Sequence, residues 1–189
     1  IYINDAIVEQ ANDEDIEDIK EIWMDRFEDD DEISTEFYFK YRFKIENTYV
    51  VRFKNQIISA LQIVPFKVKD YEDSYFILGV STRRDYEGQG FMKLLMNHVL
   101  EVYKGKRIYL QAYHPEIYVP FGFKESHRHI LYKLDKAKYA LPSSICLSQD
   151  INHLHDAYNL YVRDFSHYLI RDEDYFNNYL RKRCAAFND

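Results

Sequence analysis

Residues 79–92 read GVSTRRDYEGQGFM and connect an apolar strand to an amphipathic helix. The run Tyr75–Val80 predicts the strand, and the helix is expected over residues 91–103. Its buried stripe would consist of Met92, Leu95, Val99 and Tyr103. Gly88 and Gly90 lie just before that helix, where the absence of side chains lets backbone N–H groups approach an anion closely. Because the start of a helix also carries partial positive charge, the stretch predicts a phosphate-binding turn.

Two other glycine-rich phosphate loops do not fit this stretch. A P-loop needs Lys followed by Ser or Thr directly after its last glycine, and that pair does not follow Gly90. A dinucleotide-binding GxGxxG would need a third glycine at the position of Lys93. These two kinds of nucleotide site are therefore excluded.

A second motif, YVPFGF at Tyr118–Phe123, begins 28 residues after Gly90 and follows a predicted strand over Ile108–Ala112. Together the two motifs resemble the GNAT superfamily of acetyl-coenzyme A-dependent N-acetyltransferases, in which an (R/Q)xxGx(G/A) loop and a Y-x-x-x-G-F segment belong to one site. The first motif is also similar, more narrowly, to the enhanced-intracellular-survival (Eis) type, which is built from duplicated GNAT-like domains. The residues that match the pattern of that type are Gly79, Val80, Ser81, Thr82, Tyr86, Gly88 and Gly90.

The resemblance implies a fold of the mixed α/β (α+β) class, with a mostly antiparallel central sheet flanked by helices and, in this chain, a C-terminal helical pair. We expect a GNAT-like acetyltransferase domain at residues 1–135, a linker at 136–142 and the helical pair at 143–189. The apolar spacing that starts at Ile151 repeats the one that starts at Ile16. The pair is therefore either the truncated start of a second GNAT-like domain or simply two amphipathic helices.

The resemblance also implies an activity and a site. The protein would be a transferase that moves an acetyl group from acetyl-CoA to a primary amine by direct attack. A backbone N–H near Val80–Ser81 would stabilise the oxyanion. Tyr118 would be the catalytic general acid, because a phenol of pKa about 10 can protonate a departing thiolate of pKa about 8.5. No general base is identified among His114, Glu116 and Glu46. The cofactor-binding residues would be Val80, Ser81, Thr82, Glu87, Gly88, Gln89, Gly90, Phe91 and Met92.

Three residues depart from the family pattern. Glu87 stands where Arg is usual, Met92 where Gly or Ala is usual, and Arg84 where Pro is usual. A carboxylate beside a diphosphate is unfavourable unless it points to solvent or pairs with a cation, for which Arg83, Arg84 and Lys93 are the candidates. The alternative function is therefore a catalytically silent CoA-binding or interaction module of the same fold.

Acidic residues are concentrated near the N-terminus. The net charge of −7 argues against non-specific binding of nucleic acid. Thirteen acidic residues lie between Glu9 and Glu32, where only Lys20 and Arg26 are basic. This region is either a solvated helix face or a negative field near a cationic substrate. The second interpretation favours an acceptor that is a small-molecule or lysine-type amine. The sequence is also compatible with a homo-oligomer.

Other features of the sequence predict a cytoplasmic protein without a membrane partner. No run approaches the roughly 18 consecutive apolar residues of a membrane-spanning helix, and the N-terminus shows no signal peptide. Cys146 and Cys184 form no CxxC pair, as expected in a reducing compartment. The seven histidines form no HExxH motif, so we expect no metal.

The remaining pattern predicts the other elements of the domain. We expect a strand over Ala6–Ala11, a helix capped by Asn12 or Asp13, and a second helix capped by Thr35. Further elements are a hairpin over 49–53 and 57–65, a strand over 129–134, and helices over 150–165 and 173–186.

Overall fold

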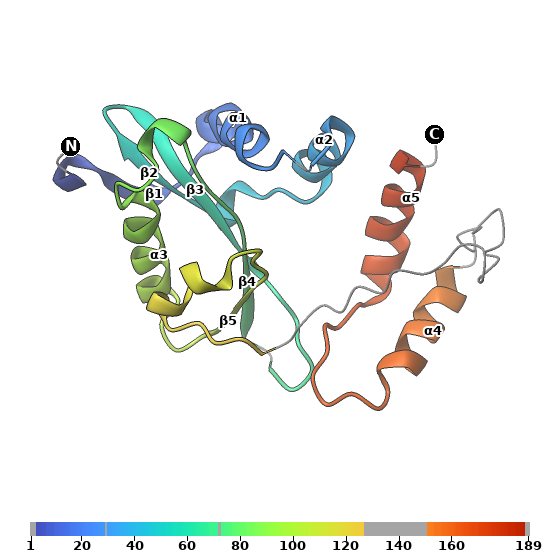
Figure 1. Ribbon diagram of the computed structural model, residues 1–189. Coiled ribbons are helices and arrows are strands. Elements are labelled where there is room, and N and C mark those ends of the chain that lie inside the picture. Colours follow the sequence, from blue (N-terminus) through green and yellow to red (C-terminus); the bar gives the residue numbers. More distant parts are fainter. Residues whose placement is uncertain (1–2, 29, 72, 127–150, 188–189) are drawn as a thin grey trace, which may run out of the picture. The chain divides into compact units, whose positions relative to one another are not determined.

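The structure is a computed structural model that describes residues 3–28, 30–71, 73–126 and 151–187 (Figure 1). The chain forms two compact units. Ile1–Ala112 and Ser166–Ile170 make up the first unit, and Tyr113–Phe165 and Arg171–Asp189 make up the second.

The first unit is built on a five-stranded sheet with the strand order β1-β2-β3-β4-β5 (Figure 1). Neighbouring strands from β1 to β4 run antiparallel, whereas β4 and β5 run parallel. The mixed, mostly antiparallel sheet that the resemblance to the GNAT superfamily implies is therefore confirmed. The strands are β1 (Ile7–Gln10), β2 (Thr48–Phe53), β3 (Gln56–Pro65), β4 (Ser74–Thr82) and β5 (Arg107–Leu110).

Helices cover both faces of this sheet. Val50 and Val51 on β2 are both fully buried, and successive residues of a strand face opposite sides. On one side Val50 belongs to a buried cluster with Ile22 of α1. On the other side, the ring of Phe53 lies 5.6 Å from that of Phe91 in α3. The helices of this unit are α1 (Ile16–Arg26), α2 (Glu32–Tyr41) and α3 (Phe91–Val102), as drawn in Figure 1.

The predicted hairpin is confirmed, and its turn has a local explanation. The two residues between β2 and β3, Lys54 and Asn55, have φ angles of 50° and 62°. Positive φ at both positions is typical of the type I′ turn, whose twist suits a two-residue connection between antiparallel strands.

The start of α2 corrects one prediction. The side chain of Asp31, not that of Thr35, caps the helix by accepting a hydrogen bond from the Ser34 backbone N–H at 2.6 Å. Thr35 lies inside the helix and is buried. A carboxylate in extended conformation just before the first turn is the better cap, because it also complements the positive end of the helix dipole.

The buried stripe of α3 differs from the predicted one in two of its four members. Met92 and Tyr103 are only partly buried. The difference is a small rotation of the helix about its axis, because Phe91 inserts its ring into the core in place of Met92. The stripe consists of Phe91, Leu95, Met96 and Val99.

The segment Ser166–Ile170 returns to the first unit and pairs with the hairpin before β4. The Lys69 N–H donates to the Tyr168 carbonyl at 2.9 Å, and the Ile170 N–H donates to the Lys67 carbonyl at 2.8 Å. This short antiparallel contact attaches a late part of the chain to the sheet domain. Nothing in the sequence pattern predicts it.

The described part of the second unit is helical. Two 3₁₀ turns, Pro115–Ile117 and Val119–Phe121, follow the first unit along the chain. Later come α4 (Ile151–Val162) and a π-helical turn, Tyr175–Leu180, which runs into α5 (Arg181–Phe187). The two predicted C-terminal helices are thus confirmed.

Several predictions concern residues outside the described ranges. The strand over 129–134 and the linker at 136–142 are among them, and the predicted division into domains at 1–135 and 143–189 stays a prediction. In the described ranges, no helix combines the length and the apolar character needed to span a bilayer.

Candidate functional site

The strand β4 contains a β-bulge close to its end. Ala60 on β3 lies opposite Ser81 on β4, whereas Gln62 lies opposite Leu78. Two steps along β3 therefore correspond to three steps along β4, and the extra residue falls at Gly79–Val80. Bulges bend a strand and free backbone groups from the ladder, so they are frequent beside binding sites.

Gly79 makes this bulge possible in two ways. Its φ of +63° lies in the left-handed region that glycine tolerates best. In addition, a Cβ atom at this position would lie 2.3 Å from Cζ3 of Trp23, far inside contact distance. The indole of α1 therefore rests directly on the glycine backbone of the bulge.

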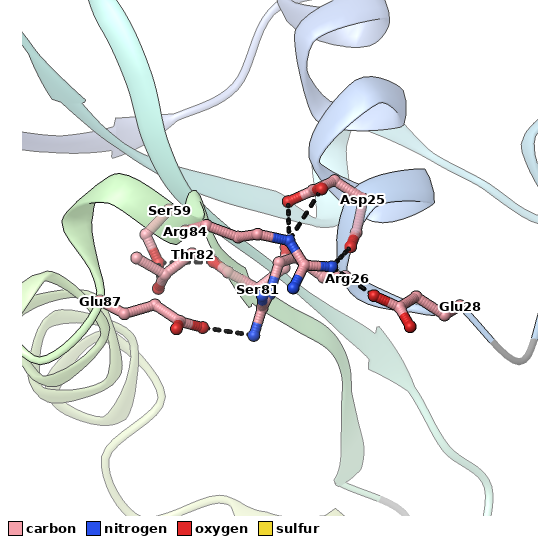
Figure 2. A network of polar contacts seen from close by, with 8 residues as sticks. All are labelled: Asp25, Arg26, Glu28, Ser59, Ser81, Thr82, Arg84 and Glu87. Atoms are coloured by element: carbon pink, nitrogen blue, oxygen red, sulfur yellow. Dashed lines mark hydrogen bonds and ion pairs between the residues drawn. The ribbon is translucent and has the colours of Figure 1, made fainter.

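Three hydroxyl groups fix the end of the bulged strand (Figure 2). The Ser59 hydroxyl donates to the Ser81 carbonyl at 2.7 Å and lies 2.9 Å from the Thr82 hydroxyl. The Ser81 hydroxyl donates to the carbonyl of Gly79 at 3.2 Å. Because these side chains already have partners, Ser81 and Thr82 offer a ligand mainly their backbone groups.

One edge of β4 is unpaired at this end. The parallel ladder joins Ser74–Ile77 to Arg107–Leu110, but β4 continues to Thr82. Among the described residues, 78–82 have no strand partner on the β5 side. Such an edge presents N–H and C=O groups, which can bind an extended ligand that carries amides.

The turn from β4 to α3 places a helix N-terminus beside this edge in the sequence. A 3₁₀ turn, Arg84–Tyr86, is followed by Gly88 and Gly90 with φ angles of 68° and 92°. Gln89 ties the turn together, since its side-chain amide donates to the Asp85 carbonyl at 2.9 Å. No side chain caps α3, so the N–H groups of its first turn lack a side-chain acceptor.

The sequence-predicted cofactor residues therefore lie on one continuous strand, turn and helix, at 80–82 and 87–92. They differ in what they can offer a ligand. The side chain of Phe91 is buried against Phe53 and Tyr86, at ring distances of 5.6 and 5.7 Å, so only its backbone is available. Gly88 is open, because a Cβ there would meet no atom within 4 Å.

Ion pairs connect the acidic helix α1 to the same turn. Arg83 donates to Glu21 at 3.0 Å and to the Ile57 carbonyl at 2.8 Å. Arg84 donates to the Asp25 side chain at 3.0 Å, and Figure 2 shows its guanidinium also reaching Glu28. These contacts raise the pKa of both arginines and lower the pKa of Glu21, in each case chiefly through the hydrogen bond between the partners.

Glu87, the carboxylate at the entrance of the glycine turn, also has a cationic partner. It pairs with Arg26, the last residue of α1, and not with Arg83, Arg84 or Lys93 (Figure 2). The negative charge that the sequence places beside the predicted anion site is thus compensated from another element.

Tyr118 lies in the second unit, between the two 3₁₀ turns. Its N–H donates to the Pro115 carbonyl at 3.0 Å, and its ring meets that of Phe123 edge-on at 6.1 Å. Burial raises the pKa of the Tyr118 hydroxyl, because a phenolate is disfavoured where water is partly excluded. His114 and Glu116, 3.2 Å apart, are both largely exposed.

Sequence reasoning missed Trp23, Arg26 and Ser59, which surround the bulge and the turn. A mid-strand glycine at position 79 was the available signal for a close neighbour, although it could not identify Trp23. Arg26 is a lone cation at the end of an acidic stretch, and nothing local relates it to Glu87, 61 residues later.

Solved structures share this fold. A GCN5-related N-acetyltransferase from Kribbella flavida matches with a TM-score of 0.53 at 21% identity, over 62% of this chain and 33% of that one. A predicted acetyltransferase with acetyl-CoA from Clostridium acetobutylicum matches with a TM-score of 0.54 at 18% identity, over 71% of this chain and 98% of that one. A GNAT family acetyltransferase from Brucella melitensis, in complex with acetyl-CoA, matches with a TM-score of 0.52 at 18% identity, over 64% of this chain and 83% of that one.

The chain spans only a third of the Kribbella protein and 46% of another neighbour. No functionally curated protein matches the sequence. A family model for the acetyltransferase (GNAT) domain, however, matches residues 8–126, which is well over half of the chain and includes both motifs. This chain therefore belongs to the GNAT acetyltransferase family.

Proposed function

We propose that this protein binds acetyl-CoA at the junction of β4 and α3 and transfers the acetyl group to a primary amine. The observation that carries the proposal is the uncapped start of α3 behind two glycines with positive φ, in a chain of the GNAT family. The Clostridium and Brucella proteins of the same fold are described with acetyl-CoA, which supports the choice of co-substrate.

Each part of the junction suits a different part of that molecule. The free N–H groups at the start of α3 would bind the diphosphate, aided by the helix dipole. The unpaired edge at 78–82 would bind the amides of the pantetheine arm as an added strand would. The thioester would then lie near the bulge at Gly79–Val80, where a freed backbone N–H can stabilise an oxyanion.

The chemistry needs few side chains. A neutral amine attacks the thioester carbonyl, the tetrahedral intermediate collapses to the amide, and the CoA thiolate departs. Tyr118 is proposed to protonate that thiolate, because it holds the tyrosine position of the Y-x-x-x-G-F segment, although burial raises its pKa and so makes it a weaker acid. The amine loses its proton to solvent or to a base that we do not assign.

The acceptor is proposed to be a cationic amine, as the acidic residues of α1 and of the stretch before α2 favour positively charged molecules. The finer resemblance to the Eis type suggests that residues 143–189 begin a second GNAT-like domain. The helices α4 and α5 are compatible with this proposal.

One observation favours a second candidate, a catalytically silent CoA-binding module. Glu87 stands where the family pattern has Arg, and no side chain is assigned as the base for the attacking amine, so the site would bind CoA without turnover.

Calorimetry with CoA, followed by a thiol-release assay with acetyl-CoA and a panel of amines, separates the candidates. An acetyltransferase binds CoA and releases thiol with at least one amine. A silent module binds CoA and releases no thiol with any of them, and a protein that does not bind CoA contradicts both candidates.

A further inference from the structure

We propose that Arg26 is a ligand for the diphosphate of the bound co-substrate, delivered by α1 and held in place by Glu87. This inference rests on the proposed function, since it assigns a further residue to the same site. It starts from a contact between two elements that are distant in sequence: the last residue of α1 pairs with the residue just before Gly88 (Figure 2).

The arginines at this turn are not equivalent. Arg83 is held by Glu21 and by the Ile57 carbonyl, and Arg84 by Asp25 and Glu28. Among the described residues, Arg26 pairs with Glu87 alone. A guanidinium has five N–H donors in a planar fork, so one carboxylate leaves several of them free.

The surroundings of Arg26 keep those donors available. Its side chain is 25% exposed, which restricts its motion without closing it off from solvent, while Glu87 is 49% exposed. A guanidinium held this way is pre-organised, and its fork matches two phosphate oxygens. The pair stands directly before the glycines and the uncapped start of α3, so the arginine and the free N–H groups can act on one anion.

Electrostatics require such a partner. If a diphosphate binds at the start of α3, Glu87 adds a like charge immediately before the turn. Arg26 can then do two things: neutralise Glu87, or neutralise it and bind the phosphate oxygens as well. The free donors favour the second role, and the two roles predict different behaviour for variants.

The test measures CoA binding by calorimetry in the full chain, with melting temperature as a check on folding. Arg26→Gln should raise the Kd for CoA by about 10- to 50-fold, in the range of a charged hydrogen-bonded contact. Arg84→Gln is the matched control, because it removes the same charge from a separate ion pair between the same turn and the end of α1, and its Kd should stay within about twofold.

The double variant Arg26→Gln/Glu87→Gln separates the two roles. It removes both charges, so a merely neutralising Arg26 would leave its Kd equal to that of the wild type. If Arg26 is a phosphate ligand, its loss should weaken CoA binding in the double variant as well, and the Kd should stay at least about fivefold above that of the wild type. The exchange Arg26→Glu/Glu87→Arg should bind better than Arg26→Glu alone, because it returns a guanidinium to the turn.

Dephospho-CoA, which keeps the diphosphate and lacks the 3′-phosphate, shows which phosphate group Arg26 contacts. The loss caused by Arg26→Gln should be the same for CoA and dephospho-CoA; a loss confined to CoA would overturn the diphosphate assignment. A wild type that binds CoA beside an Arg26→Gln variant that binds equally well would overturn this inference alone. A wild type that does not bind CoA would instead overturn the proposed function.

Discussion

The first unit contains two junctions at which a strand leads into a helix, and they treat the helix N-terminus in opposite ways. After β1, the capped element is the 3₁₀ turn Asp13–Asp15, which runs directly into α1: the side chain of Asn12 accepts a hydrogen bond from the Glu14 N–H, and Asp15 accepts one from the Asn12 N–H, at 2.9 and 3.0 Å. After β4, Gly90 precedes α3 and no side chain caps it.

The difference shows which junction serves stability and which is open to a ligand. At the first, orphan N–H groups are satisfied from within the chain, and Asp15 is further fixed by Arg52 at 2.8 Å. At the second, the same kind of group is left for solvent or an anion. Variants at the first junction should therefore affect unfolding, and variants at the second should affect ligand binding.

The largest expected effect lies outside both junctions and tests the chemistry that the open one would serve. Tyr118→Phe removes one oxygen and keeps the ring, so CoA binding should be almost unchanged. The turnover rate in the thiol-release assay should fall by about 10²–10⁴-fold, the usual contribution of a positioned acid.

Tyr113→Phe is the matched control for that variant, since Tyr113 is 91% exposed and belongs to the same unit. Its turnover should stay close to that of the wild type. An active wild type whose Tyr118→Phe variant is just as fast would refute the assignment of the general acid and leave the family membership intact.

At the open junction, Gly88→Asn should weaken CoA binding by roughly tenfold or more and change the melting temperature little. Asn tolerates positive φ better than most residues, and a Cβ at this position meets no protein atom, so the added side chain obstructs only the ligand. Calorimetry gives the Kd. The magnitude corresponds to about 1.4 kcal/mol of binding free energy.

The other end of α3 supplies the control. Gly105 also has positive φ, +82°, and open space around its Cβ position. Gly105→Asn should leave the Kd for CoA unchanged. Equal losses in both variants would point to general damage to the helix and would break the comparison between the junctions.

At the first junction, after β1, Asp15→Ala should lower the free energy of unfolding by about 2–3 kcal/mol and leave the Kd for CoA unchanged. The variant deprives the Asn12 N–H and Arg52 of a buried acceptor, and unmet hydrogen-bonding groups are costly. Urea denaturation measures the loss. Asn12→Ala removes only the capping side chain and should cost about 1 kcal/mol.

The smallest effect concerns the ion pair between α1 and the open junction. Arg83 lowers the pKa of Glu21, so the pair stabilises the folded state above the ordinary Glu pKa, and the contribution is lost as pH falls through the lowered value. Glu21→Gln should therefore flatten the dependence of stability on pH below about 4.5. The change should stay under about 1 kcal/mol, because the pair is exposed. An unchanged acid profile would show that the pair adds nothing.

Local pattern was sufficient to predict most of the sheet and the glycine turn. The strand that became β4, the turn at Gly88 and Gly90, and the helix after it are encoded by neighbouring residues, whose period and conformational freedom can be read directly. For the same reason the tail helices were predictable from apolar spacing alone.

What could not be predicted depends on tertiary placement. The pair between Arg26 and Glu87 exists because the end of α1 meets the turn after β4, and Trp23 of the same helix packs on Gly79 at the bulge. The cap of α2 was mispredicted for another reason: Asp31 lies in an acidic run, and several of its neighbours have equivalent side chains.

The short pairing of Ser166–Ile170 with Lys67–Lys69, in the connection between β3 and β4, attaches the chain to the first unit a second time. The chain between Ala112 and Ser166 is therefore a loop in the covalent sense, with both of its ends held by the first unit. A chain anchored only at Ala112 would explore space as a free tail, whereas a loop of this length has already lost the entropy of closure, which grows only as the logarithm of its length. The two backbone hydrogen bonds at Lys67 and Lys69 therefore close this stretch of chain at its far end, and their free energy has to offset that loss of entropy.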